Sequence, residues 1–468
     1  MKIKTSNIII ILSIFCTLSA KAQIKGKVFE QKSKVPIALA TINIEGTTIS
    51  VLSNEQGLFK IFIPENYRNK KLIISCLGYK NDTLIAPYKL NKVYNIALAK
   101  QLIQLPEVVI KSHSAIDILK KAIDKIPDNY ATKPVYLNAY YREMVATNGT
   151  FVKYVDAATK IYYSGYNLPY DFGNFYYFDY AKYKSNSPKA YPQGANKAPS
   201  KNDAVQILEV RKSNNLEQFN NRWDFEASLK KFDISGGPLQ VTSADIVKHR
   251  KDMLNPDTWK YYKFKYEGTV TNNSKETYKI TFQPKKKNKV ALWQGTMYID
   301  KESYAFIDFE YSIDDKCRDF LKQFNTEIII ELDNKRDKKQ IKKSKIKRTI
   351  ENTNQEVKIS YSEYQGKWYV SHIRIKNIIE NTGNLFEKKE YTTLLDLYVN
   401  GVQLQNVIPI DIDKVYKSSN FSFLYHYPSK YHPKFWEHYN TPIPTKIVKK
   451  ALLDLEKEKS LQEQFRDN

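Results

Sequence analysis

Apolar and polar residues alternate with a period of two in short runs between residues 24 and 100. In the clearest run, Phe59 and Ile61 point to one face and Lys60 to the other, as in a strand with one buried face. Turn residues such as Gly57 separate the runs. Several short strands at regular spacing, each bounded by a turn, predict a small β-sandwich.

The same alternation returns between residue 135 and about residue 420. In the run from 262 to 266, aromatic side chains face one way, whereas Lys263 and Lys265 face the other. Residues 180–203 interrupt the pattern with many Pro, Lys, Ser and Asn residues, which predicts a long loop. We therefore expect a larger antiparallel β-rich domain in this part of the chain.

Two segments have the period of an amphipathic helix instead. Ser114 and Asp117 have the spacing of a capping box, although Asp stands where Glu or Gln is usual. The apolar residues that follow share one helical face: Ile116, Leu119, Ile123 and Ile126. A final helix is predicted from Thr445, after Pro444. Its apolar stripe comprises Val448, Leu452 and Leu455.

The predicted fold class is mainly β, and the chain divides into five parts. These parts are a signal peptide at 1–22, a β-sandwich at 23–100, a linker with an amphipathic helix at 101–134, a β-rich domain at 135–420, and an aromatic segment with a C-terminal helix at 421–468.

The N-terminal segment has the pattern of a secretory signal. Lys2 and Lys4 precede an apolar run at 8–18, and residues 20–22 read Ala-Lys-Ala before Gln23, the expected mature start. No later segment approaches the roughly 20 apolar residues that a membrane-spanning helix needs. We therefore expect an exported protein in the periplasm or associated with the outer membrane.

The first domain resembles a known module. Its stretch "GKVFEQKSKVPIALATINIEGTTISVLSNEQGLFKIFIPEN" and the following "LIISCLGYKN" are similar to the carboxypeptidase-like regulatory domain, a prealbumin-like sandwich of many Bacteroidetes envelope proteins. The residues that carry the resemblance are Gly26, Pro36, Ala40, Gly46, the turn at 54–57, Phe59, Gly78 and Tyr79. The resemblance implies a fold and no function, because such modules stand before many unrelated partners.

Two further resemblances concern the chain beyond residue 100. SusC-like TonB-dependent receptors carry the same sandwich and a stretch similar to residues 105–110, but here a helix comes next in place of a plug and barrel. The pattern "W-x-G-x-M-Y-I-D" at 293–300, with its flanking strands, resembles half-barrels of the LolA/LolB lipoprotein-carrier type. That similarity implies a curved half-barrel sheet that shelters an acyl chain.

Charge and cysteine content change this picture little. The formal charge is +24, but 64 of the 74 basic residues are Lys, as AT-rich codon usage produces, and an exported protein does not meet nucleic acid. Only Cys76 and Cys317 follow the signal, so no disulfide framework is expected. Cys76 shares a strand face with Leu72 and Ile74 and is expected to pack there.

The motifs of common enzymes are absent from the sequence. No His has Glu three residues later, so the zinc-ligand pair of a carboxypeptidase is missing. The 15 glycines form no phosphate-binding loop and no Gly-x-Ser-x-Gly elbow. Ser228 and Lys231 satisfy Ser-x-x-Lys without its companion motifs and are interpreted as a surface helix. We therefore name no catalytic, cofactor or metal residue and expect no cofactor.

Three clusters of residues could form a binding site, but for each of them we favour a purely structural role. His426, His432 and His438 could hold a metal ion, but they lie among aromatic residues, which are expected to dock the tail on the sheet. Eight Tyr and three Phe in residues 162–183 could stack on sugars, or simply pack in a sheet. Nine basic residues in 335–348 could meet membrane phosphates, or form a solvated hairpin.

The leading functional hypothesis is a non-enzymatic cell-envelope protein with a binding or scaffolding role. Its expected partner is an envelope protein, a lipid or a glycan, with peripheral association at the outer membrane and no nucleic acid. One alternative is a periplasmic carrier of lipid or lipoprotein acyl chains, which requires an apolar cavity of on the order of 300 Å³ or more. Another is an accessory protein of TonB-dependent transport.

Overall fold

The computed structural model describes residues 22–89, 92–101, 114–166, 203–214, 237–272, 275–285, 293–315, 348–383, 386–416, 424, 427–428, 430–457 and 459–467. Several sequence predictions lie outside these ranges. They are the signal peptide up to residue 21, the stretch 105–110, the surface helix at 228–231, most of the tyrosine-rich segment, and all but the last residue of both the loop at 180–203 and the basic run at 335–348.

The N-terminal part is a two-sheet sandwich, as the alternation predicts. One sheet has the order β4 (Leu58–Ile63), β1 (Ala22–Glu30) and β7 (Val93–Leu98), and the other β3 (Ser50–Leu52), β2 (Thr41–Ile44), β5 (Leu72–Ser75) and β6 (Asp82–Leu84). A short 3-10 helix, η1 (Glu65–Tyr67), follows β4. Phe59 and Ile61 are fully buried between the sheets, and Cys76 packs at the edge of this core.

Gly57 is the turn residue that this sandwich cannot replace. It has a φ of +73°, and a Cβ there would lie 2.1 Å from the carbonyl oxygen of Val28. The turn before β4 therefore requires glycine both for its backbone conformation and for its close approach to β1.

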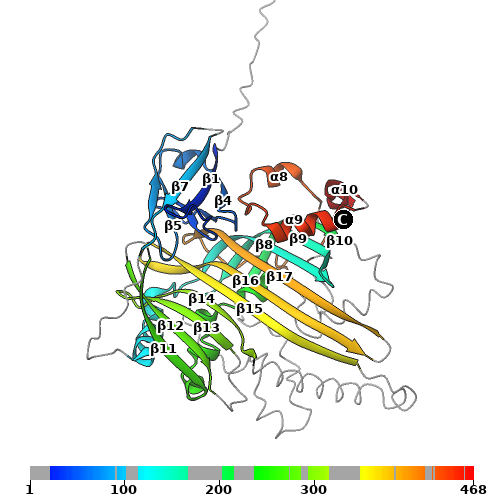
Figure 1. Cartoon of the computed structure of the whole chain (residues 1–468). Coiled ribbons are helices and arrows are strands. Elements are labelled where there is room, and N and C mark those ends of the chain that lie inside the picture. The colour runs from blue at the N-terminus through cyan, green and yellow to red at the C-terminus, as the bar shows by residue number, and fades with distance from the viewer. Residues whose placement is uncertain are drawn as a thin grey trace, which may run out of the picture.

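The second domain is one antiparallel sheet of ten strands that does not close into a barrel. Its order is β10 (Ala204–Asn214), β9 (Thr150–Tyr163), β8 (Val135–Thr147), β17 (Phe386–Gln403), β16 (Lys367–Gly383), β15 (Arg348–Tyr364), β14 (Phe306–Ile313), β13 (Trp293–Asp300), β12 (Lys275–Pro284) and β11 (Tyr262–Asn272). The sheet twists strongly across its width (Figure 1). The predicted mainly-β fold class is confirmed.

One face of this sheet is apolar and covered by helices. These are α1 (Ala115–Asp124), α2 (Ile126–Asn129), α5 (Pro238–Thr242) and α6 (Ile246–His249), with the 3-10 helices η4 (Asp252–Leu254) and η5 (Pro256–Tyr261). Helix α1 starts at the predicted cap, where Ser114 accepts a hydrogen bond from the backbone N–H of Asp117. The sequence assigned this helix to a linker, but its Leu119 and Ile123 are buried in the core of the sheet domain.

A buried carboxylate connects these helices to the sheet. Asp245, which is fully buried, caps α6 by accepting from the backbone N–H of Val247 and Lys248. Three buried tyrosine hydroxyls donate to the same carboxylate at 2.6, 2.8 and 2.6 Å. They belong to Tyr163, Tyr166 and Tyr361. The hydrogen bonds to this buried carboxylate thus come from backbone amides and tyrosine hydroxyls, and Lys248 adds an electrostatic interaction.

The other face of the sheet carries the sandwich and the C-terminal helices, which lie on the same side in Figure 1. The helices are α8 (Pro433–Glu437), α9 (Lys446–Leu455) and α10 (Leu461–Asp467). Helix α9 begins after its cap Thr445 and buries Val448 and Leu455, as predicted. No helix of the described chain is long and apolar enough to span a membrane.

Candidate functional site

A continuous row of polar side chains crosses the face that carries the sandwich. Each member is the cross-strand partner of the next, so the row passes through all ten strands. From β11 to β10 the members are Lys265, Thr281, Thr296, Glu310, Lys358, Arg374, Asp396, Arg142, Asp156 and Arg211. We call this set the polar row. Directly opposed residues on one face of a sheet interact, so the row is a chain of neighbouring polar groups, eight of them charged.

The β8–β10 end of the polar row is buried and fully paired. Asp156 is completely buried and accepts from Arg142 Nε at 2.9 Å and from Arg211 Nη2 at 2.7 Å. The hydroxyls of Tyr140 and Tyr154 complete its contacts at 2.5 and 2.7 Å. Burial alone would raise the pKa of Asp156, but the two guanidinium groups outweigh burial and hold that pKa at about 2.

A second carboxylate anchors the middle of the polar row. Asp396 accepts from Arg374 Nε at 2.7 Å and lies 3.1 Å from His372 Nε2. Burial opposes its ionisation, yet Arg374 and His372 hold the pKa of Asp396 well below its usual value. Burial in turn lowers the pKa of His372. The imidazole, which stacks on Tyr398 at 4.5 Å between ring centres, is therefore neutral at physiological pH.

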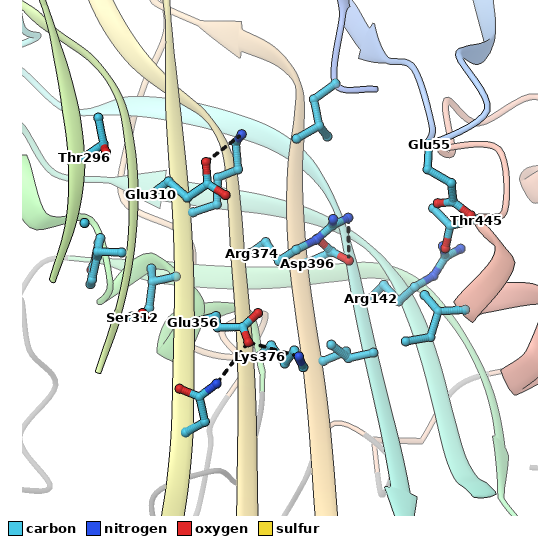
Figure 2. Close-up of a pocket in the computed structure, with 18 of the residues that line it drawn as sticks. Glu55, Arg142, Thr296, Glu310, Ser312, Glu356, Arg374, Lys376, Asp396 and Thr445 are labelled. Atoms are coloured by element: carbon cyan, nitrogen blue, oxygen red, sulfur yellow. Dashed lines mark hydrogen bonds and ion pairs between the residues drawn. The ribbon is translucent and has the colours of Figure 1, made fainter. Parts of the chain in front are cut away.

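An open cavity of about 840 Å³ lies over the middle of the polar row. Its floor is formed by strands β8 and β12–β17, and its walls by the sandwich and by the segment that leads into α9. Figure 2 shows Glu55 of the sandwich and Thr445 before α9 on one side, with Thr296 and Ser312 on the other. The cavity thus exists only where the N-terminal domain, the sheet and the C-terminal segment meet.

The cavity lining combines charges of both signs with one apolar side. Four cationic and four acidic side chains line it: Arg142, Lys358, Arg374, Lys376, Glu55, Glu310, Glu356 and Asp396. In Figure 2 the pairs Arg374–Asp396 and Lys376–Glu356 lie at the centre. The apolar side lies towards the sandwich and α9 and includes Leu39, Met144, Leu394, Ile447 and Val448. Such a lining suits a ligand that has both polar and apolar parts.

Hydrogen bonds fix the sandwich as a wall of this cavity. Thr48 Oγ1 donates to the carbonyl oxygen of Val402 at 3.1 Å and accepts from its N–H at 2.7 Å. The backbone N–H of Phe62 donates to Asn440 Oδ1 at 2.8 Å. Glu55 accepts from the backbone N–H of Lys446. These contacts join the sandwich to β17 and to the segment before α9.

The histidine-rich segment is an aromatic dock, as we favoured from the sequence. His432 Nδ1 lies 2.9 Å from Glu209 Oε2, and His426 lies outside the described residues. Trp436 is buried against Tyr140, and the guanidinium of Arg211 lies 4.5 Å from the Trp436 ring. Within the described ranges, no group of three or more His, Cys, Asp or Glu residues could hold a metal ion.

Apart from Lys265, whose outward direction follows from alternation, the residues of the polar row were not expected from the sequence. Most of them lie between apolar neighbours on a strand, as in Val357-Lys358-Ile359, Ile373-Arg374-Ile375 and Leu395-Asp396-Leu397. This alternation predicts charges on the second face, and that signal could have been used. The register that lines the charges up depends on pairings between residues up to about 250 positions apart, which a local pattern does not contain.

Comparison with known proteins identifies two segments. Residues 24–110 match the model of the CarboxypepD_reg-like domain, and residues 254–367 match that of a family of unknown function, DUF5686. The second match covers strands β11–β15, of which β12–β15 supply part of the cavity floor. No curated protein matches the chain.

Two solved structures show only distant similarity. A DUF1329 family protein from Desulfovibrio piger is 11% identical with a TM-score of 0.22, and the match covers 63% of this chain and 95% of that one. A structure described for lipid–protein interactions in lipovitellin is 6% identical with a TM-score of 0.22, covering 62% of this chain and 28% of that one. At these scores neither carries an argument. The family model instead confirms the resemblance seen in the sequence: the N-terminal part of this chain is a CarboxypepD_reg-like domain.

Proposed function

We propose that this chain is a non-enzymatic binding protein of the cell envelope, whose ligand occupies the cavity over the polar row. The observation that carries the proposal is the joint construction of the cavity by the sandwich, the sheet and the segment before α9. Its volume of about 840 Å³ lies within the usual range for small-molecule sites, about 300–1,000 Å³.

The charged groups of the site support binding over catalysis. Asp396 and Asp156 each accept hydrogen bonds from arginine, so both are held ionised and occupied. His372 is buried, and its Nε2 already faces Asp396. A general base needs a free acceptor with a pKa near the working pH, and neither carboxylate meets that condition. Because these two carboxylates are fixed and paired, they are better suited to hold neighbouring groups in place than to move a proton.

The lining also bears on the acyl-chain hypothesis. That hypothesis requires an apolar hollow, but the apolar face of the described sheet is packed with helices. The cavity on the opposite face is large enough, yet eight charged side chains line it. Desolvating those charges against a hydrocarbon chain is costly, so we propose a ligand with a polar portion over β14–β16.

Native mass spectrometry of the purified full-length chain tests the proposal. A ligand of defined mass should remain bound to the native chain and should be lost in Ser312→Trp, whose new ring projects into the cavity and takes up part of the ligand's space. The control is Thr83→Trp, at an exposed sandwich position that does not line the cavity. Absence of any ligand, or equal retention by Ser312→Trp, would contradict binding in this cavity. A hydrolase activity abolished by a single substitution in the purified chain would overturn the non-enzymatic part.

Export is a separate part of the proposal and rests on the sequence of residues 1–22. We propose that the mature chain begins at Gln23 and resides in the periplasm or at the outer membrane. Fractionation of the native organism, followed by mass determination of the N-terminal peptide, tests this. A cytoplasmic chain that retains residues 1–22 is the contrary outcome.

A further inference from the structure

Two cations face each other in the floor of the cavity. Lys358 on β15 and Arg374 on β16 are direct cross-strand partners, so their Cβ atoms lie about 4.5–5.5 Å apart. Both side chains belong to the polar row and line the cavity. Like charges that are directly opposed destabilise a sheet unless an anion compensates them.

The two cations differ in how they are compensated. Arg374 binds Asp396 through Nε and donates through Nη2 to the Tyr398 hydroxyl at 3.0 Å. Lys358 has one ion-pair contact, 3.9 Å from Glu310, a side chain that is 71% exposed. Within the described part of the chain, Lys358 Nζ makes no hydrogen bond. Besides Glu310, Lys358 interacts electrostatically with Asp308, and its ammonium group can still donate hydrogen bonds into the cavity.

A third cation lies beside this pair. Lys376 follows Arg374 by two positions on β16, so its side chain is on the same face. It is 3.1 Å from Glu356 and 34% exposed, whereas Lys358 is 26% exposed and Arg374 36% exposed. Partial burial reduces screening by water, so an anion among the three groups would interact more strongly than at an open surface.

We propose that Lys358, Arg374 and Lys376 form a subsite for a phosphate group of the ligand. The Nε and Nη2 edge of Arg374, which would grip a carboxylate through two hydrogen bonds, is occupied by Asp396. The remaining donors are the ammonium groups of Lys358 and Lys376 and the Nη1 group of Arg374. They approach an anion from different directions, which suits the tetrahedral oxygens of a phosphate. This inference rests on the proposed function, since it names the chemistry of the same ligand.

The apolar side of the cavity begins next to the subsite. Leu394 is the cross-strand partner of Lys376, and Met144 is the partner of Leu394. A phosphate bound by the three cations would therefore have apolar side chains one and two strands away. Either free phosphate or the headgroup of a phospholipid satisfies this chemistry.

Titration calorimetry with the full-length chain distinguishes these sources. The probes are inorganic phosphate, dihexanoyl phosphatidylglycerol below its micelle concentration, and octyl glucoside, an amphiphile without phosphate. Binding of inorganic phosphate assigns a free phosphate ligand, and binding of the phospholipid alone assigns a lipid headgroup. In either case Lys358→Gln should bind about tenfold more weakly or worse, because a hydrogen bond to a charged group is lost. Lys358→Arg should retain most of the affinity.

The matched control is Lys263→Gln, which removes an exposed lysine from the same face of the sheet outside the cavity. Loss of affinity equal to that of Lys358→Gln would indicate non-specific attraction and overturn the subsite. Failure of both phosphate probes to bind, or unchanged binding by Lys358→Gln, would also overturn it. If native mass spectrometry then still finds a ligand that Ser312→Trp displaces, the binding function stands and only the phosphate assignment falls.

Discussion

The positive charge of Lys358 is expected to favour ligand binding but to lower the stability of the unliganded chain. Its ammonium group faces Arg374 on the neighbouring strand, and it interacts with the carboxylates of Glu310, at 3.9 Å, and Asp308. We expect Lys358→Gln to stabilise the unliganded chain by about 0.5 kcal/mol, because the opposed like charges are removed. Urea denaturation compared with Lys263→Gln measures this. A loss of stability above about 1 kcal/mol would mean that Lys358 is structurally required.

Asp308, one strand from Lys358, makes stability depend on pH. Burial raises its pKa to about 6, although Lys358 and a hydrogen bond from Ser360 oppose the shift. A raised folded-state pKa favours the protonated form, so its stabilising effect is complete below about pH 4 and is lost as the pH rises through 6. Two pKa units correspond to about 2 kcal/mol after allowance for partial exposure.

Asp308→Asn therefore has a predictable effect on this profile. The amide has no charge to bury, so the variant should be more stable than the native chain at pH 7.5 and equal to it near pH 4. Urea denaturation across this pH range measures the difference. A constant difference at all pH values would assign the effect to packing and not to ionisation.

At the scale of single elements, two helix caps differ greatly in importance. Ser114 is exposed and caps α1 alone, so Ser114→Ala should cost about 1 kcal/mol. Asp245→Ala should cost at least about 3 kcal/mol, because it removes the cap of α6 and leaves three buried tyrosine hydroxyls without an acceptor. Thermal or urea denaturation measures the loss of stability in each variant. The loss in Asp245→Asn should lie between those of Ser114→Ala and Asp245→Ala. Equal losses would contradict the role of Asp245 as a connector.

The same elements show what the sequence could predict. Strands with one apolar face, such as Phe59 to Ile63, and capped helices, such as the one after Ser114, follow from local periodicity and cap chemistry. The packing of α1 on the sheet does not follow from its local pattern. Its apolar face signals burial but does not specify against which sheet, and the sheet residues that cover it are far away in sequence.

The candidate site also depends on contacts between residues that are far apart in the sequence, so it could not be predicted. Apart from Glu55 of the sandwich, its cations and carboxylates come from strands between residues 142 and 396, and each is one charge in an ordinary strand. They become a site only through cross-strand register and through the placement of the sandwich. Local sequence specifies neither, because register depends on which strands pair.

At the scale of the whole molecule, the sandwich is attached to both other parts of the cavity wall. Asn440 accepts from the backbone of Phe62 in the sandwich, and Asn400 on β17 donates to the carbonyl oxygen of Asn440. The segment before α9 therefore lies between the first domain and the sheet and binds both. Loosening the sandwich should open the cavity without unfolding either domain, because each has its own core.

Thr48→Val tests this arrangement, because it removes both hydrogen bonds to Val402 while preserving side-chain volume. We expect faster hydrogen exchange at the Val402 amide, by about tenfold for a net loss of about 1.4 kcal/mol, and weaker ligand binding. Exchange in the sandwich core, at Ile42 and Ile61, should not change. Thr83→Val, at an exposed sandwich position, is the control. An equal rise in exchange throughout the sandwich core would mean that the substitution destabilises the domain itself. No rise at Val402 would mean that this contact does not hold the sandwich in place as a wall of the cavity.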